Sequence, residues 1–167
     1  MDRPLILPLA SCIQPSLVGG KALGLGRLLA GGFPVPPGLC VTTEAYDHAL
    51  RVPGFSPAEQ WQTALNSSGA ERQRILSSCR TVIQNHDIVG LTDQIVKQVR
   101  KLGLPSSGLW AVRSSATNED GARASFAGVY RTHLGIPLEE VGSAVRDLWL
   151  SIWDERVLNY HAASGLS

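Results

Sequence analysis

The stretch LWAVRSSATNEDGARASFAGVYRTHL, residues 109–134, holds the pattern on which the fold prediction depends. Leu109 to Arg113 is a short apolar run typical of a strand, and Val129 to Leu134 alternates well enough for a second strand. The polar residues 114–124 between them predict a loop. A strand, a polar loop and a further strand are therefore expected in this part of the chain.

Helices and strands alternate on both sides of this stretch. Leu25, Leu28 and Leu29 recur at helical spacing, whereas Gly24 and Gly26 within the same segment predict the close approach of another backbone or a ligand. The expected strands are 5–9 and 39–42, and the expected helices are 20–30, one capped by Thr42 or Thr43, 71–84, 88–102, one from Pro137 to Ile152, and 154–163. The order predicts an α/β (α+β) fold with a mixed sheet and flanking helices. Residues 52–104 are interpreted as a variable, mostly helical insert.

Composition narrows the class of protein. The 167 residues include 15 Lys+Arg and 14 Asp+Glu, with 44% hydrophobic residues, which excludes most disordered proteins. A net charge of +1 argues against a general nucleic-acid or membrane-surface binder, and no apolar run approaches the roughly 18 residues of a membrane span. The three cysteines form no CxxC pair, so we predict neither a disulfide framework nor a zinc site and expect the cytoplasm.

Gly19-Gly20-Lys21 is the first candidate phosphate-binding element. Two glycines let backbone N–H groups approach an anion, a helix N-terminus adds partial positive charge, and Lys21 adds a full charge. The segment is neither a Walker A loop, because Ala22 follows the lysine, nor a dinucleotide fingerprint, because Leu29 stands where the third glycine belongs. Taken alone, a flexible turn with a solvated lysine is the better interpretation.

Arg113 with Ser114-Ser115-Ala116-Thr117 is the second candidate, because a guanidinium at the end of a buried strand suits phosphate oxygens and the hydroxyls beside it can donate to the same oxygens. An ion pair from Arg113 to Glu119 or Asp120 explains the same residues equally well. Ala124-Ser125-Phe126-Ala127-Gly128 is the third candidate, for which a packed turn is the simpler interpretation.

Magnesium binding by the adjacent Glu119 and Asp120 is less favoured than simple loop solvation. The four histidines lack metal-ligand spacing, and no serine sits in a nucleophile elbow. The sequence therefore predicts no metal site within this chain.

Three segments in this order resemble the N-terminal nucleotide-binding domain of the phosphoenolpyruvate synthase and pyruvate phosphate dikinase family, which rifampicin phosphotransferases share. They are Gly19-Gly20-Lys21, the run from Gly32 to Gly38 with Thr42 to Tyr46, and the run from Val112 to Gly128. Trp149 to Arg156 resembles the segment that follows in the family. The resemblance covers residues of about 17–50 and 109–160.

The resemblance implies the first lobe of an ATP-grasp fold, with ATP clamped against a second lobe. It implies that Lys21 and Arg113 contact the ATP phosphates as electrostatic catalysts. The full set of predicted nucleotide-binding residues is Gly19, Gly20, Lys21, Arg113, Ser114, Ser125, Gly128 and Thr132. It also implies Mg²⁺ ligands in the second lobe, and phosphoryl transfer from ATP to a histidine on a swivelling domain and then to pyruvate.

The family domain continues past residue 167, so we expect the chain to be one lobe of a larger enzyme that includes a phosphohistidine domain and an acceptor domain. We expect the 167 residues alone to be inactive. A rifampicin phosphotransferase, a stand-alone nucleotide-binding or regulatory module, and a structural domain without ligand are the alternatives.

Overall fold

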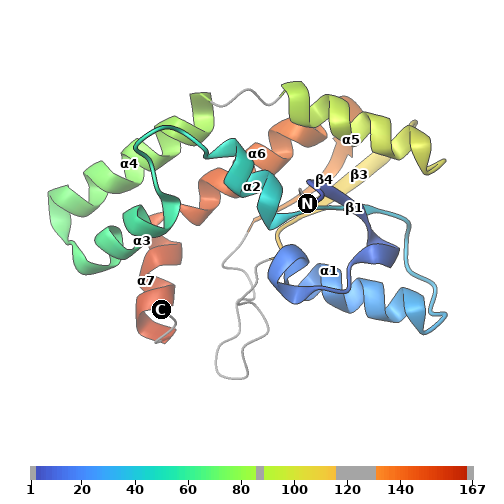
Figure 1. Cartoon of the computed structure of the whole chain (residues 1–167), viewed down its shortest axis with the longest axis horizontal. Helices are drawn as coiled ribbons and strands as arrows, with labels where there is room; N and C mark the ends of the chain where they lie inside the picture. Colours follow the sequence, from blue (N-terminus) through green and yellow to red (C-terminus); the bar gives the residue numbers. More distant parts are fainter. Residues whose placement is uncertain (1–2, 86–88, 116–130, 165–167) are drawn as a thin grey trace.

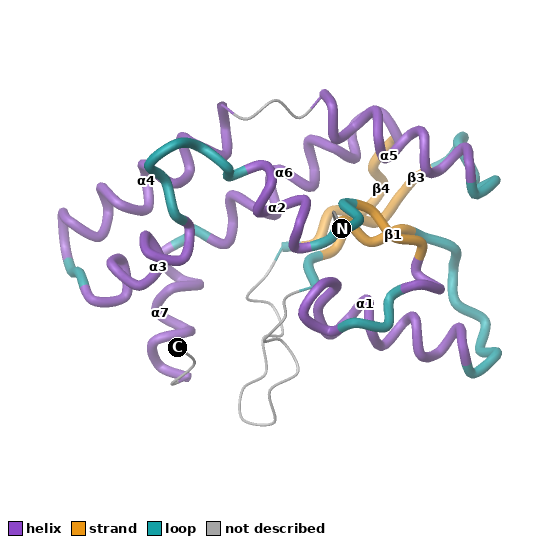
Figure 2. The backbone as a smooth tube through the Cα atoms, viewed as in Figure 1, coloured by secondary structure: helices purple, strands orange, loops and turns teal. Residues whose placement is uncertain are grey.

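The computed structural model describes residues 3–85, 89–115 and 131–164, and these form a mixed helix and strand structure, as the sequence predicts. Figures 1 and 2 show a helical end built from α3, α4 and α7, an end that holds the strands and α1, and α6 running between them. The elements in chain order are β1 (Ile6–Pro8), η1 (Leu9–Ser11), α1 (Pro15–Ala30), β2 (Leu39–Val41), α2 (Thr43–Ala49), α3 (Pro57–Asn66), α4 (Gly69–Asn85), α5 (Val89–Lys101), β3 (Leu109–Arg113), β4 (Thr132–Pro137), η2 (Leu138–Glu140), α6 (Val141–Ile152) and α7 (Glu155–Ser164).

The described strands form two separate antiparallel pairs instead of the one mixed sheet that we predicted. β1 pairs with β2, with Leu7 opposite Cys40, and β3 pairs with β4, with Arg113 opposite Thr132. The strands are short, and Pro8 and Pro137 end β1 and β4 without the backbone N–H that a longer ladder needs. Pro137 is thus the last strand residue before η2, not the first helical residue that we predicted.

One face of the β3–β4 pair is exposed. Leu109 and Leu134 retain 76% and 72% of their accessible surface, and Arg113 and Thr132 are exposed as well. Val112 points the other way, into the core with α5 and α6. Arg113 therefore ends a strand that is buried on one face only, which corrects the expectation of a buried strand.

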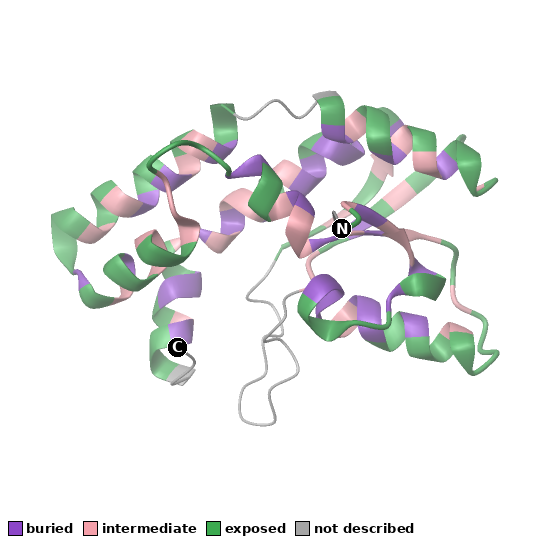
Figure 3. Ribbon diagram, viewed as in Figure 1, coloured by how far each residue is buried: buried purple, intermediate pink, exposed green. Residues whose placement is uncertain are grey.

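Three apolar clusters hold the chain together, and Figure 3 shows their buried residues along the facing sides of the helices. The first joins α5 and α6 with β1, β3 and η2; the second lies between α1, η1 and β2; the third joins α2, α3, α4 and the α6–α7 junction. α5 supplies Leu91, Ile95 and Val99 to the first cluster, as its helical spacing predicts. The C-terminal part of residues 52–104 is thus core structure.

The glycines of α1 differ in their surroundings. A Cβ on Gly26 would lie 2.5 Å from the Cys12 carbonyl oxygen, so η1 and α1 approach each other closely there. A Cβ on Gly24 would meet nothing within 4 Å. The predicted backbone approach is therefore found at Gly26 and not at Gly24.

The predicted side-chain cap of α2 is absent at Thr42. Thr42 is the N-cap residue, as proposed, but its hydroxyl makes no cap hydrogen bond. Thr42 Oγ1 instead donates to the Pro4 carbonyl at 2.8 Å and ties the N-terminal strand to the beginning of α2. None of the helices within the described ranges is long and apolar enough to cross a membrane.

Candidate nucleotide-binding site

α1 is broken at Gly19, two residues before Lys21. Gly19 has φ 72° and ψ 173°, while the residues on both sides are helical, so a new helical segment begins after it. Only glycine adopts this backbone conformation without strain. The predicted helix at residues 20–30 is therefore the second part of a longer element, and Gly20 and Lys21 form its first turn.

Ser115 contacts this break from the end of β3. Its hydroxyl oxygen accepts a hydrogen bond from the Ala22 backbone N–H at 3.0 Å, across 93 positions of sequence. Its backbone lies so close to Gly19 that a Cβ there would be 2.0 Å from the Ser115 carbonyl oxygen. The Gly19-Gly20-Lys21 turn and the Arg113-Ser114-Ser115 segment are therefore packed directly against each other.

The turn is also supported from β2 and α2. The Cys40 thiol donates to the carbonyl of Val18 at 3.8 Å, and Thr43 Oγ1 donates to the carbonyl of Ser16 at 3.2 Å. A hydrogen bond with the Cys12 thiol, together with burial, raises the pKa of the Cys40 thiol, so it stays protonated as a donor. The residues just before Gly19 are thereby held by β2 and α2.

Arg113 and Thr132 lie opposite each other at the open end of the β3–β4 pair. Residues directly opposite in an antiparallel pair project from the same face, with Cβ atoms about 4.5–5.5 Å apart. Both are exposed, and Ser114 next to Arg113 is half-buried. A ligand beside the Arg113 guanidinium is therefore within reach of the Thr132 hydroxyl.

The structure thus brings together six of the predicted residues in three segments: Gly19, Gly20, Lys21, Arg113, Ser114 and Thr132. Ser125 and Gly128, and the acidic pair Glu119 and Asp120, lie outside the described residues. Two cations from distant parts of the sequence therefore lie on segments that are in contact, next to the first turn of a helix, and these groups are of the kinds that bind phosphate oxygens.

From the sequence, Ser115 is one of the hydroxyls beside Arg113 that can donate to phosphate oxygens, but its role as the cap of the Lys21 segment is not predicted. The sequence offers one indirect signal, since a glycine before a helix has no side chain to cap it and the capping group must come from elsewhere. The identity of that group depends on a contact between residues 22 and 115, which local sequence patterns do not reveal.

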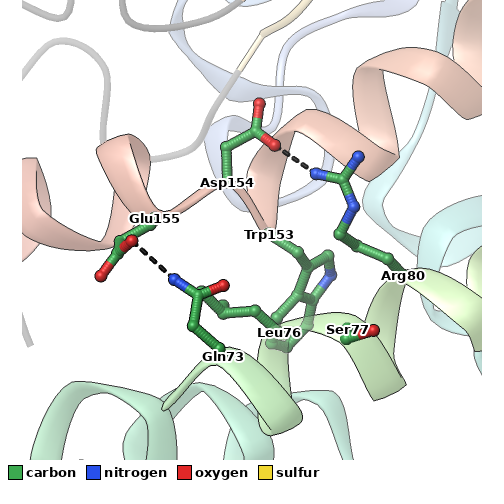
Figure 4. Close-up of a pocket in the computed structure, with 7 residues that line it drawn as sticks. All are labelled: Gln73, Leu76, Ser77, Arg80, Trp153, Asp154 and Glu155. Carbon is green, nitrogen blue, oxygen red and sulfur yellow. Dashed lines mark hydrogen bonds and ion pairs between the residues drawn. The ribbon is translucent and has the colours of Figure 1, made fainter. Parts of the chain in front are cut away.

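A pocket of about 340 Å³ lies away from these residues, between α4 and the junction of α6 and α7 (Figure 4). Its polar groups are paired with one another: Arg80 with Asp154, and Gln73 with Glu155 at 2.6 Å. Leu76 and Trp153 form its apolar wall. These pairings link α4 to the α6–α7 junction, and none of the predicted site residues within the described ranges lines the pocket.

Metal-binding groups do not gather in the described part of the chain, where no three His, Cys, Asp or Glu residues could hold an ion together. The three cysteines, Cys12, Cys40 and Cys79, are free and buried.

Comparison with known proteins decides the family. Residues 15–167 match the family model described as pyruvate phosphate dikinase, AMP/ATP-binding domain. The chain belongs to this AMP/ATP-binding domain family. The match includes both segments that meet at Gly19 and Ser115.

Several curated proteins are similar to this AMP/ATP-binding domain over most of its length. Phosphoenolpyruvate synthase of Aeropyrum pernix is 38% identical over 96% of this chain and 21% of the relative. Rifampicin phosphotransferase of Bacillus cereus is 36% identical over 91% of this chain and 18% of the relative. The prodigiosin synthesizing transferase PigC of Serratia marcescens is 35% identical over 98% of this chain and 17% of the relative. The chain therefore spans about a fifth of the length of these relatives.

Proposed function

We propose that this chain is the ATP-binding lobe of a dikinase-type phosphotransferase, the first lobe of an ATP-grasp-type domain. The observation that carries the proposal is the contact between Gly19 and Ser115, which joins the Lys21 turn to the Arg113 strand end in a chain of the AMP/ATP-binding family. Neither the Lys21 turn nor the Arg113 strand end alone would indicate a nucleotide-binding site.

Each described residue has a part in this proposal. Lys21 and Arg113 hold phosphate oxygens of ATP and offset their negative charge, and the backbone N–H groups of the first turn after Gly19 add hydrogen bonds. The hydroxyls of Ser114 and Thr132 donate to the same oxygens or to the ribose. ATP supplies the phosphoryl group, and this lobe positions the phosphates and neutralises their charge instead of attacking them. Ser125 and Gly128 remain predicted contacts.

The rest of the reaction belongs to the larger protein that the relatives' lengths indicate. We propose that a histidine on another domain receives the phosphoryl group and passes it to pyruvate. Mg²⁺ would be held by acidic residues of the second lobe. A reducing compartment, the cytoplasm, suits the three free cysteines. On this proposal the 167 residues bind ATP but do not turn it over alone.

Titration of the ¹⁵N-labelled chain with Mg-ATP tests the binding site. We expect amide shifts at Gly20, Lys21 and Ser114. We also expect affinity to fall at least about ten-fold in Lys21→Ala and in Arg113→Ala, since a hydrogen bond to a charged group contributes about 1.5–3 kcal/mol.

Two matched variants control for loss of charge. Lys97→Ala removes an exposed lysine from α5, and Arg74→Ala removes an exposed arginine from α4; both should bind as the wild type does. Unchanged affinity in Lys21→Ala and Arg113→Ala, or an equal loss in the controls, contradicts the proposed site.

Rifampicin is a second candidate for the phosphoryl acceptor, because the chain is 36% identical to the rifampicin phosphotransferase and 38% identical to the phosphoenolpyruvate synthase. Incubating the full-length protein with ATP and either pyruvate or rifampicin separates the two by the phosphorylated product. ATP binding with no phosphorylated product, and no phosphohistidine on the protein, identifies a nucleotide-binding module without chemistry.

A further inference from the structure

The second segment of α1 starts without a capping side chain of its own. The residue before a helix normally accepts a hydrogen bond with its side chain from the N–H two or three positions later. Gly19 occupies that place and has no side chain, and the third residue after it is Ala22. A side-chain cap for the Ala22 N–H can therefore come only from a residue elsewhere in the chain.

Ser115 provides this group from a distance. The Ala22 N–H donates to Ser115 Oγ at 3.0 Å, which is the hydrogen bond that a serine in place of Gly19 would otherwise accept. The cap of the Lys21 segment is thus carried by the loop that follows β3, and forming it requires the two segments to be in contact.

The backbone of Ser115 fixes the same contact by shape. Its carbonyl oxygen and carbon would lie 2.0 Å and 2.5 Å from a Cβ on Gly19, so any side chain there pushes the segments apart. Lys21 lies between Gly19 and Ala22, and Arg113 precedes Ser115 by two residues. The two contacts of Ser115 therefore set how far the Lys21 segment stands from the Arg113 strand end.

We propose that Ser115 is a positioning residue for nucleotide binding: its hydroxyl caps the Lys21 segment and holds Lys21 and Arg113 at the spacing that ATP phosphates need. This inference rests on the proposed function, since it assigns to Ser115 the geometry of that site. Ser115 acts through Lys21 and Arg113.

The uncharged hydroxyl matters for this role. An aspartate is as good a capping residue as a serine, but it places a negative charge beside bound phosphates. Serine satisfies the Ala22 N–H without adding a charge beside the phosphates. A cap test and a nucleotide-affinity test should therefore respond differently to Ser115→Asp.

Four variants separate these effects: Ser115→Ala, Ser115→Thr, Ser115→Asp, and Ser107→Ala as a control at an exposed serine before β3. Hydrogen exchange of the Ala22 amide measures the cap without ligand, and calorimetric titration with Mg-ATP measures affinity. We expect Ser115→Ala to speed Ala22 exchange and to weaken ATP binding about five-fold, equivalent to about 1 kcal/mol. Ser115→Thr should restore both quantities, and Ser107→Ala should change neither.

Ser115→Asp gives the sharper outcome. Ala22 exchange should stay slow because the carboxylate still caps the segment, while ATP affinity falls at least about ten-fold through charge repulsion. A double-mutant cycle adds a readout that a purely structural role would not move. Ser115→Ala should cost less affinity in the Lys21→Ala background than in the wild type, because the serine acts through the lysine.

The possible failures are distinguishable. Fast Ala22 exchange in Ser115→Ala with unchanged ATP affinity overturns the positioning role and leaves a local cap. Unchanged exchange overturns the cap itself. If the wild type does not bind Mg-ATP, the proposed function fails together with the role of Ser115 in it, and the exchange data still decide whether Ser115 caps α1.

Discussion

The Arg131 guanidinium donates a hydrogen bond to the Asp154 carboxylate, with 3.1 Å between Nη2 and Oδ2. The other carboxylate oxygen of Asp154 accepts from Arg80 on α4. Asp154 lies between α6 and α7, and Arg131 directly precedes Thr132 at the start of β4. One carboxylate therefore joins the helical end of the molecule to the strand that carries a predicted nucleotide contact.

Asp154→Asn should lower the free energy of unfolding by about 1 kcal/mol, because partly exposed ion pairs contribute little singly and more when they share a partner. Urea unfolding at low and high NaCl concentration measures this. The difference from the wild type should shrink at high salt, since salt screens the charges. Asp93→Asn, at an exposed position of α5, is the control. An equal loss at both salt concentrations would mean that the pairs are not the cause.

Gly24→Ala and Gly26→Ala form a matched pair on α1. Alanine at position 24 meets open space, so stability should rise by about 0.5–1 kcal/mol from the better helix propensity. Alanine at position 26 is forced against the Cys12 carbonyl, so stability should fall by about 1–3 kcal/mol. Thermal unfolding of both variants checks the signs. Two changes of the same sign would refute the η1–α1 approach at Gly26.

We expect the protein to lose stability in acid because of His161. Burial lowers its pKa below the ordinary value of about 6.5, and its ring packs edge-on against Trp61 with centroids 5.3 Å apart. Below about pH 6.5 the unfolded chain binds a proton that the folded chain does not, so stability is present above that pH and declines as pH falls through the folded pKa.

Urea unfolding between pH 5 and pH 7.5, followed by tryptophan fluorescence, measures the slope for His161. His161→Phe should flatten this slope, whereas His48→Gln at an exposed position of α2 should not. A slope that is unchanged in His161→Phe assigns the acid sensitivity elsewhere.

We expect the protein to lose stability in base because of Cys79. Burial raises the pKa of its thiol to about 11, and the side chain is fully enclosed between α4 and its neighbours. The unfolded chain loses the thiol proton from about pH 8.5, so the stability linked to this group declines between about pH 8.5 and 11. The stability difference between the wild type and Cys79→Ala, measured from pH 7.5 to 10.5, should narrow as pH rises. A constant difference contradicts this.

Much of the architecture follows from local sequence. Helical spacing predicts α5 and α6, and the Leu109–Arg113 run predicts β3, because in each the pattern of apolar residues matches the face that becomes buried or paired. The glycines of α1 predict a close backbone approach, which is found at Gly26.

Other features depend on contacts between distant residues. Ser115 lies against the break at Gly19, the Thr42 hydroxyl donates to the Pro4 carbonyl, and the outer face of β3 is exposed. None of these has a local signature. The cations Lys21 and Arg113 could be selected from the sequence, but the contact between their segments is evident only in the fold, and Ser125 and Gly128 lie outside the residues described.

α6 packs against both ends of the molecule. Its N-terminal half supplies Val141, Ala144 and Val145 to the cluster under the strands, and Trp149 contacts that cluster as well as the one between α3, α4 and α7. Neither end can therefore lose its packing without loosening the same helix. The consequence is cooperativity: the end that holds the strands and the helical end should unfold in a single transition, although neither of the two described strand pairs extends into the helical end.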